Sequence, residues 1–151
     1  MLRVLDFEDM DQVAVLQRQV RDHALPWIKV LHTPEEDRQF FRGHVFSICK
    51  LWGCFENEQL VGFIAFRQGW IDHLYVRPET QQRGVGTRLL SVALRPSQNM
   101  MLWTFQRNTS ARHFYEKRGF VLVKETDGQG NEEKEPDALY SWQATSRPEA
   151  R

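Results

Sequence analysis

Two glycines spaced as Gly84-x-Gly86 lie in a short loop, residues 81–87, between a strand-like segment and a helix-like segment. Glycine lets the backbone approach a ligand closely, because it has no side chain and adopts positive φ angles. The first turn of a helix carries unpaired N–H groups and a partial positive charge, and both attract anions. The spacing therefore predicts a site for a phosphate or a pyrophosphate at this junction.

Two familiar phosphate-binding loops do not match this spacing. A P-loop requires a lysine after its last glycine, and Thr87 stands at that position. A dinucleotide-binding fingerprint requires a third glycine where Leu89 stands. Residues 81–86 instead match the pattern Gln/Arg-x-x-Gly-x-Gly/Ala, so the rest of the chain must indicate which anion is bound.

Together with the segment 74–78 before it, this loop resembles the acyl-CoA binding motif of the GNAT superfamily of N-acetyltransferases. Residues 103–120 support the resemblance, because they are similar to the second signature of that family, Asn-x-x-Ala-x-x-Phe-Tyr-x-x-x-Gly-Phe. The resemblance covers about residues 1–143. It implies a single acetyltransferase domain over residues 1–143, followed by a flexible tail at 144–151.

The resemblance implies that acetyl-CoA is the co-substrate. Backbone groups of Leu74, Tyr75 and Val76 would then pair with the pantetheine arm, as an added strand would. Asn108 either caps a helix, which asparagine does well, or hydrogen-bonds to the same arm, and both roles can hold. The backbone N–H groups expected to hold the pyrophosphate belong to Gln82, Arg83, Gly84, Val85, Gly86 and Thr87. The Thr87 hydroxyl and the charge of Arg83 or Arg88 would add to this site.

Two further positions are candidates for catalysis. Tyr115 is either a core aromatic residue or, as the resemblance implies, the acid that protonates the departing thiolate. Asp72 is the first candidate to bind or deprotonate the attacking amine, and His73 or an ordered water is the alternative. Strand alternation predicts that Asp72 and His73 point to opposite faces. A backbone N–H at the end of the strand 71–76 is expected to stabilise the charged oxygen.

The elements that must position these residues follow from hydrophobic periodicity and capping signals. Helices are expected after Asp6 and after Thr33, both of which begin capping-box patterns. Gly119 and Phe120 fit the C′ and C″ positions of a Schellman helix ending. The other predicted helices lie at 88–94 and 109–118, and the predicted strands at 2–4, 45–55, 60–67, 70–76, 100–106, 120–125 and 138–143.

This order of elements matches an α/β (α+β) fold of the GNAT type. Such a fold has a mixed, mostly antiparallel central sheet of about seven strands, flanked by about four helices. The length of 151 residues suits one domain. The predicted last strand can pair with another chain at a sheet edge, so the sequence is compatible with a homodimer.

Composition limits the classes of partner. The formal net charge is zero, so a broad attraction to nucleic acid is not expected. No run of about 18 apolar residues indicates a membrane span, and the N-terminus is unlike a signal peptide, which suggests a cytoplasmic protein. Cys49, Cys54 and the scattered histidines show no ligand spacing, so no metal site is expected.

We therefore predict an N-acetyltransferase that moves an acetyl group from acetyl-CoA to an amine of a small molecule or peptide through a ternary complex. The main alternative is a non-catalytic acyl-CoA-binding sensor or regulatory module, against which the presence of Tyr115 argues. A nucleotide-binding domain is a further alternative, but it leaves residues 108–120 unexplained. The acidic loop 131–137 either borders the acceptor or is a solvated hairpin loop.

Overall fold

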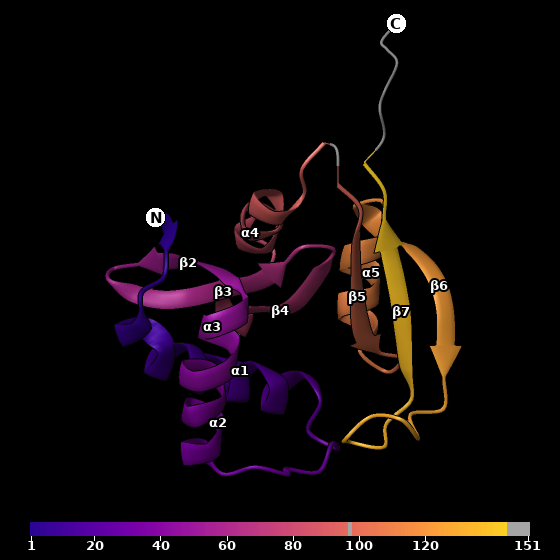
Figure 1. The fold of residues 1–151 in the computed structure, drawn as a ribbon, viewed down its shortest axis with the longest axis horizontal. Coiled ribbons are helices and arrows are strands. Elements are labelled where there is room, and N and C mark those ends of the chain that lie inside the picture. The colour runs from indigo at the N-terminus through magenta and orange to yellow at the C-terminus, as the bar shows by residue number, and fades with distance from the viewer. Residues whose placement is uncertain (97, 145–151) are drawn as a thin grey trace, which may run out of the picture. The chain divides into compact units, whose positions relative to one another are not determined.

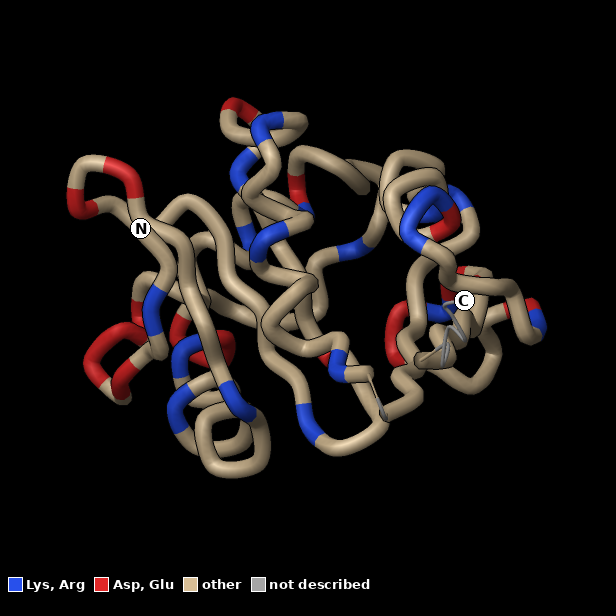
Figure 2. Tube along the Cα trace, turned by 90° about the horizontal axis from the view of Figure 1, so that it is seen from above, with Lys and Arg blue, Asp and Glu red and all other residues tan. Residues whose placement is uncertain are grey.

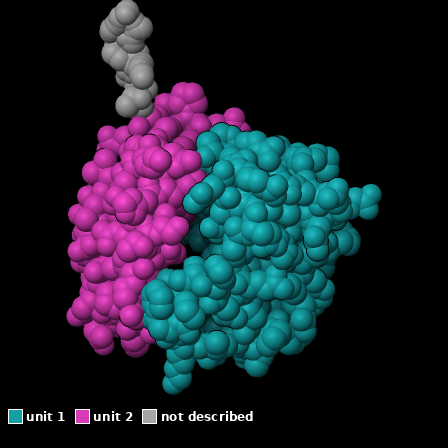
Figure 3. Space-filling model, turned by 180° about the vertical axis from the view of Figure 1, so that it is seen from behind, with its two compact units in different colours: residues 1–67, 71–93 teal, residues 68–70, 94–151 magenta. Residues whose placement is uncertain are grey.

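The computed structural model describes residues 1–96 and 98–144, and the chain forms two compact units (Figure 3). Unit 1 comprises residues 1–67 and 71–93, and unit 2 comprises residues 68–70 and 94–151. Seven strands pair in the order β1-β2-β3-β4-β5-β7-β6 (Figure 1). The predicted mixed, mostly antiparallel seven-stranded sheet with four helical segments is confirmed. Most of the predicted tail, residues 145–151, lies outside the described residues.

Unit 1 holds the first strands and most of the helices. Its antiparallel strands pair Val4 with Trp52 and Gly53 with Phe63. Within this unit, α1 and α2 lie on one side of the strands and α4 on the other (Figure 1). The strands are β1 (Leu2–Val4), β2 (Lys50–Glu56), β3 (Gln59–Arg67) and β4 (Trp70–Val76), of which Trp70 is counted in unit 2. The helices are α1 (Met10–Ala24), α2 (Pro34–Phe40), the π-helical η2 (Phe41–Val45), α3 (Phe46–Ile48) and α4 (Val85–Ala93), with 3-10 turns η1 (Phe7–Asp9) and η3 (Pro78–Thr80).

Both predicted capping boxes are present. The Asp6 amide donates to the Asp9 carboxylate at 2.7 Å, ahead of α1. At the start of α2, the Glu36 amide donates to the Thr33 hydroxyl at 3.1 Å, and the Thr33 amide donates to the Glu36 carboxylate at 2.8 Å. These reciprocal bonds satisfy N–H groups that a helix start leaves unpaired, so local sequence determines where both helices begin.

The second helical segment extends further than predicted. The helical run that begins at Pro34 continues through η2 to Ile48, so the strand expected at 45–55 begins only at Lys50. Phe41 and Val45, four residues apart, are both buried in the core on this run. This spacing places both side chains on one helical face, and burying that face favours helix over strand.

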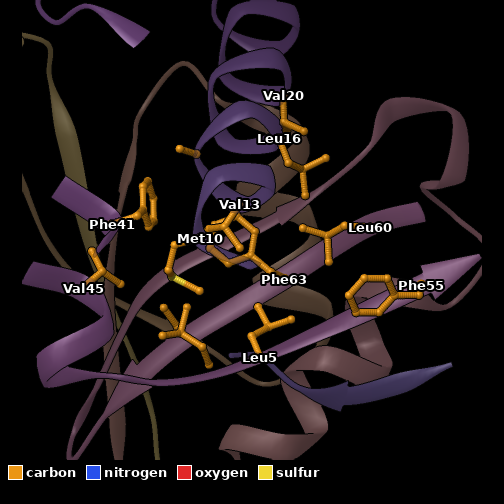
Figure 4. Packing of buried hydrophobic residues seen from close by; sticks show 13 residues of the cluster. Leu5, Met10, Val13, Leu16, Val20, Phe41, Val45, Phe55, Leu60 and Phe63 are labelled. Carbon is orange, nitrogen blue, oxygen red and sulfur yellow. The ribbon is translucent and has the colours of Figure 1, made fainter. Parts of the chain in front are cut away.

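The core of unit 1 fills the space between the sheet and the first two helical segments (Figure 4). Leu16 of α1 lies next to Leu60 of β3 in this view, and both side chains are buried. Burying a leucine or phenylalanine side chain contributes about 1.5–3 kcal/mol each, so this cluster is the main source of stability for the unit. Its buried members are Leu5, Met10, Val13, Ala14, Leu16, Val20, Phe41, Val45, Leu51, Phe55, Leu60, Phe63 and Ala65.

Unit 2 contains β5 (Met100–Phe105), α5 (Thr109–Lys117), β6 (Val121–Thr126) and β7 (Asp137–Trp142). The last strand, β7, lies between β5 and β6 and is antiparallel to both, with Tyr140 facing Leu102 on one side and Leu122 on the other. The prediction that the last strand forms a sheet edge is therefore wrong, because β6 occupies that position. A homodimer remains a prediction, but the last strand is not at the sheet edge and cannot form the pairing that was proposed for it.

Charged residues of both signs are interspersed along the chain in both units (Figure 2). This distribution agrees with the zero formal net charge and gives no long segment of one sign. Among the described residues, the structure has no helix that is long and apolar enough to cross a membrane.

Candidate functional site

The loop after β4 has the backbone conformation that its glycine pattern predicted. Gly84 has φ of +84°, and a Cβ at this position would meet nothing within 4 Å. Gln82 also has a positive φ, +67°. The Arg88 amide donates to the Gly84 carbonyl at 3.0 Å, which is the first turn of α4. The positive φ of Gly84 thus turns the chain directly into the helix start, where unpaired N–H groups are expected.

Hydrogen bonds from Arg77 and Gln81 hold the β4 end of this turn. The Arg77 guanidinium donates to the Leu60 carbonyl at 3.0 Å, and the Arg77 amide donates to the Val61 carbonyl at 2.8 Å. The Gln81 side chain donates to the Val76 carbonyl at 2.9 Å. The start of the segment between β4 and α4 is therefore held against β3.

Gly62 on β3 was not predicted from the sequence, and it determines how closely α4 approaches the sheet. A Cβ at this position would lie 3.1 Å from both the Tyr75 carbonyl oxygen and the Leu89 Cδ1, and 3.2 Å from the Val85 Cγ1. These distances are too short for an ordinary contact. A glycine inside a strand often marks such a close approach, so the signal was present in the sequence.

The two arginines predicted near the phosphates already have partners. Arg83 forms an exposed ion pair with Glu56, with its guanidinium 2.8 Å from the carboxylate. Arg88 donates to the Cys54 sulfur at 3.4 Å. An exposed ion pair contributes about 0–1 kcal/mol to stability, so a phosphate group could readily replace Glu56 as the partner of Arg83.

Asp72 is held by an arginine that the sequence analysis did not identify. Arg67 donates to both carboxylate oxygens of Asp72, at 2.6 Å and 3.2 Å, and the Cys49 thiol donates to one of them at 3.4 Å. Burial, together with Asp72, raises the pKa of the Cys49 thiol to about 12. Cys49 is thus a neutral thiol at physiological pH, and it does not supply a thiolate nucleophile.

His73 lies among aromatic rings on unit 1, which we name the His73 cluster. The cluster consists of His73 with Phe40, Phe41, His44, Phe63 and Tyr75. The ring centroid of His73 lies 5.1 Å from that of Phe41 and 6.1 Å from that of Tyr75. Burial lowers the pKa of His73 to about 4; His44 acts in the same direction, and Asp72 opposes them. His73 is therefore neutral at physiological pH.

Asp72 and His73 are adjacent on β4 and have different partners. The partner of Asp72, Cys49, packs against the core cluster of unit 1, to which Phe41 and Phe63 belong. The His73 ring contacts the same two phenylalanines. Asp72 thus contacts Arg67 and Cys49, whereas His73 contacts Phe41 and Phe63, and the placement of the two side chains on opposite faces stays a prediction.

In unit 2, Asn108 and Tyr115 mark the two ends of α5. The Asn108 side chain accepts from the Ala111 amide at 3.2 Å, so its role as an N-cap is confirmed. At the other end, the Gly119 amide donates to the Glu116 carbonyl at 3.2 Å, and the Phe120 amide donates to the Tyr115 carbonyl at 3.1 Å. These two bonds, with φ of +93° at Gly119, form the predicted Schellman ending.

The Schellman ending also fixes the Tyr115 ring. Tyr115 is buried, and its ring centroid lies 5.3 Å from that of Phe120 and 5.3 Å from that of Phe114. The contact with Phe120 is the hydrophobic contact that usually accompanies this helix ending. Tyr115 is thus a packed aromatic residue in unit 2, and this packing agrees with its description as a core residue.

A hydrogen-bond network ties α5 to β7. The Tyr140 hydroxyl accepts from the Arg112 guanidinium at 2.8 Å and donates to the Glu116 carboxylate at 2.6 Å. Burial, and next the bond to Glu116, raises the pKa of Tyr140 above its ordinary value. Because Tyr140 is buried, losing this network would leave charged partners unsatisfied, so the network stabilises the position of α5.

The acidic loop between β6 and β7 is more ordered than a solvated hairpin. Glu135 is buried and accepts from the Arg107 guanidinium at 2.8 Å and 3.1 Å. The Asn131 side chain donates to the Asp137 carboxylate at 3.0 Å. The carboxylates of Glu135 and Asp137 therefore have hydrogen-bond partners within unit 2.

The structure assigns the predicted site residues to two groups. Unit 1 contains Asp72, the backbone of 74–76 and the loop residues 82–87, all on one strand–loop–helix segment. Unit 2 contains Asn108 and Tyr115. Among the described residues, no group of three or more His, Cys, Asp or Glu side chains is arranged to hold a metal ion.

Comparison with known proteins gives a family match over half of the chain. Residues 47–122 match the model of an acetyltransferase (GNAT) domain. The Mycobacterium tuberculosis protein named Probable N-acetyltransferase Rv2775 is 50% identical over 54 residues, which are 34% of this chain and 31% of that protein. The peptidyl-lysine N-acetyltransferase YiaC of Escherichia coli is 30% identical over 73 residues, 48% of this chain and 50% of that protein.

The matches cover 31% and 50% of the length of these two curated relatives. Among solved structures, the PaiA N-acetyltransferase of Thermoplasma acidophilum in complex with coenzyme A superposes with a TM-score of 0.72. The alignment covers 95% of this chain and 98% of that chain, at 20% sequence identity. At 20% sequence identity, this similarity shows a shared fold and nothing more specific.

Proposed function

The chain belongs to the GNAT acetyltransferase family, and we propose that it transfers an acetyl group from acetyl-CoA to a primary amine. The observation that carries the proposal is the glycine loop, because its positive φ at Gly84 leads directly into the N-terminus of α4. The second signature, with its Asn108 cap and its Schellman ending, supports the same function.

The residues present fit acetyl-CoA in charge and in backbone conformation. The space around Gly84 is open, and the N–H groups of 82–87 would hold the pyrophosphate at the helix start. Backbone groups of Leu74, Tyr75 and Val76 would pair with the pantetheine arm, and Asn108 would add a hydrogen bond to it. Acetyl-CoA supplies the acetyl group as a thioester.

In the proposed reaction the amine nitrogen forms a bond to the acetyl carbon, and the bond from that carbon to sulfur breaks. A backbone N–H at the end of β4 would donate to the oxygen that becomes charged. Tyr115 would protonate the leaving thiolate, and the resulting phenolate would be reprotonated from solvent. An acceptor in its ammonium form must first lose a proton to free the nitrogen lone pair, and the nitrogen loses a second proton as the amide forms. Asp72 or water would accept these protons and pass them to solvent, and no covalent link to the protein is required.

Asp72 is the group proposed to bind or deprotonate the amine. Its pairing with Arg67 fixes the carboxylate but also occupies both of its oxygens. An amine would therefore have to share the carboxylate with Arg67. If Asp72 is the base, Asp72→Asn should lower turnover more at low pH than at high pH, and an unchanged pH profile would exclude this role.

The acceptor is proposed to be an amine of a small molecule or of a peptide. The name of the E. coli relative, a peptidyl-lysine N-acetyltransferase, makes a lysine side chain one candidate within this class. The decisive experiment measures thiol release from acetyl-CoA with a panel of primary amines. Release that depends on the amine supports the transferase, whereas acetyl-CoA binding without release from any amine would support a sensor instead.

A further inference from the structure

The His73 cluster has no role in the phosphate loop or in the proposed chemistry of Tyr115, yet it is open to solvent. Phe40 is 45% exposed, and His73 and Tyr75 are half-buried, whereas Phe41 and Phe63 are buried beneath them. The cluster thus combines a closed aromatic floor with rings that a ligand can reach. Such surfaces take flat apolar groups, because aromatic pairs gain about 0.5–1.5 kcal/mol beyond area burial.

His73 also has an unmet hydrogen-bonding requirement. Its Nδ1 is buried and has no hydrogen-bond partner among the described residues. A buried polar atom without a partner costs about 1–3 kcal/mol, and the phenylalanine rings around His73 carry no N–H or O–H that could donate to an unprotonated Nδ1. An N–H group of a bound amine would remove this cost.

The backbone beneath the cluster is unusual at the same place. Phe41 and His44 belong to the π-helical segment η2, which interrupts the helical run from Pro34 to Ile48. Such π-helical turns are rare in proteins, and those that do occur often lie at functional sites. This segment holds Phe41 against His73 and leaves His44 exposed, stacked on Phe40 at 5.3 Å.

The charges around the cluster favour an apolar arm over a second cation. Asp72 is bound by Arg67, and Asp11 is bound by Arg42 of η2, at 2.7 Å. A second ammonium on the acceptor would have to displace one of these arginines. An aromatic ring would need no such exchange.

The position of His73 in the chain connects the cluster to the reaction. His73 directly precedes Leu74, and the backbone of Leu74 is proposed to face the acyl-CoA arm. An acceptor must deliver its amine to this end of β4. The following inference therefore depends on the proposed function.

We propose that the His73 cluster is the acceptor subsite and that it selects a primary amine on a short arm carrying an aromatic ring. Phe40 and Tyr75 contact the ring of the acceptor. His73 is a specificity residue that accepts a hydrogen bond from the amine.

The test compares three amines as acceptors with acetyl-CoA. 2-Phenylethylamine and 2-cyclohexylethylamine differ in the aromaticity of the ring, and 1,4-diaminobutane carries a second cation. We expect kcat/KM for the phenyl compound to exceed that for the cyclohexyl compound by about 2- to 12-fold, which corresponds to one aromatic pair. The diamine is expected to be the poorest of the three.

Two leucine variants locate the effect. Phe40→Leu should remove the preference for the phenyl ring, through a higher KM, and should leave acetyl-CoA binding unchanged. Phe46→Leu is the matched control, because Phe46 is 36% exposed on α3 and contacts Phe7 at 5.6 Å rather than the cluster. His73→Phe keeps a ring but removes the nitrogen, so it should raise KM for both ring amines alike.

Equal kcat/KM for the two ring amines, or equal effects of the two leucine variants, would overturn the subsite while leaving the transferase intact. Absence of thiol release from every amine would contradict the proposed function instead. The subsite would then be tested by calorimetric titration of 2-phenylethylamine into protein saturated with CoA. Equal affinity of wild type and Phe40→Leu in that titration would overturn the inference.

Discussion

Tyr115 and Tyr140 show how two buried tyrosines in one unit have different physical tasks. Tyr115 is held by its ring and its carbonyl, through Phe120 and the Schellman bonds. Tyr140 is held by its hydroxyl, which joins Arg112 to Glu116. Removing the hydroxyl should therefore affect chemistry at the first residue and stability at the second.

Tyr115→Phe is expected to lower kcat by about 10²- to 10⁴-fold, because a positioned acid contributes this much to proton transfer. Affinity for acetyl-CoA should change little, since the ring remains packed. Tyr140→Phe is the control, and it should lower the free energy of unfolding by about 1–3 kcal/mol through the unsatisfied partners, with a small change in kcat. Steady-state kinetics and urea denaturation measure both. Unchanged kcat in Tyr115→Phe would exclude its role as the acid.

His73 should make stability depend on pH. Its pKa is lowered by burial from about 6.5 to about 4, so between these values the unfolded chain binds the proton and the folded chain does not. The free energy of unfolding should therefore keep its maximal contribution from His73 above pH 6.5 and should decrease as the pH drops toward 4. The slope is at most about 1.4 kcal/mol per pH unit.

Urea denaturation at several pH values in this range measures the effect. His73→Phe should flatten this part of the profile. His113→Phe, on the exposed side of α5, should retain it. Identical slopes in wild type and His73→Phe would contradict the burial argument.

At the scale of elements, the approach of α4 to β3 decides the geometry of the proposed cofactor loop. Gly62 permits this approach, because Val85 and Leu89 of α4 and the Tyr75 carbonyl surround the position of its missing Cβ. A small residue on one strand thus sets the position of a helix start and of a β4 carbonyl at the same time. Both are groups that the proposed function assigns to acetyl-CoA.

Gly62→Ala should therefore weaken acetyl-CoA binding by about 10-fold or more, while the free energy of unfolding falls by about 1–3 kcal/mol from overpacking. Gly43→Ala is the control, since a Cβ there would meet nothing within 4 Å. Calorimetric titration and thermal denaturation of both variants test this. Wild-type affinity in Gly62→Ala would mean that the position of α4 does not matter for binding.

The elements also show what sequence reasoning can reach. The caps at Asp6 and Thr33 and the Schellman ending at Gly119 were predicted, because each depends on residues a few positions apart. The Arg67–Asp72 pair, the role of Gly62 and the place of β7 were missed. These depend on which helix covers which strand and on strand order, and local patterns do not determine either.

At the scale of the whole molecule, the two GNAT signatures fall in different compact units. The cofactor loop and Leu74 belong to one unit, and Asn108 and Tyr115 to the other. Each unit has its own structural support, through the core around Phe63 in unit 1 and the Arg112–Tyr140–Glu116 network in unit 2. We therefore assign acetyl-CoA binding first to the glycine loop of unit 1, at the N-terminus of α4.

The most direct test of this claim is calorimetric titration of the wild-type chain with acetyl-CoA, ATP and NAD, with Gly84→Val as the matched variant. We predict that acetyl-CoA binds at least about 10-fold more tightly than ATP or NAD. We also expect Gly84→Val to lose that binding, because a β-branched residue is strained at a φ of +84°. Equal binding of ATP, no binding of acetyl-CoA, or full affinity in a folded Gly84→Val variant would contradict the claim.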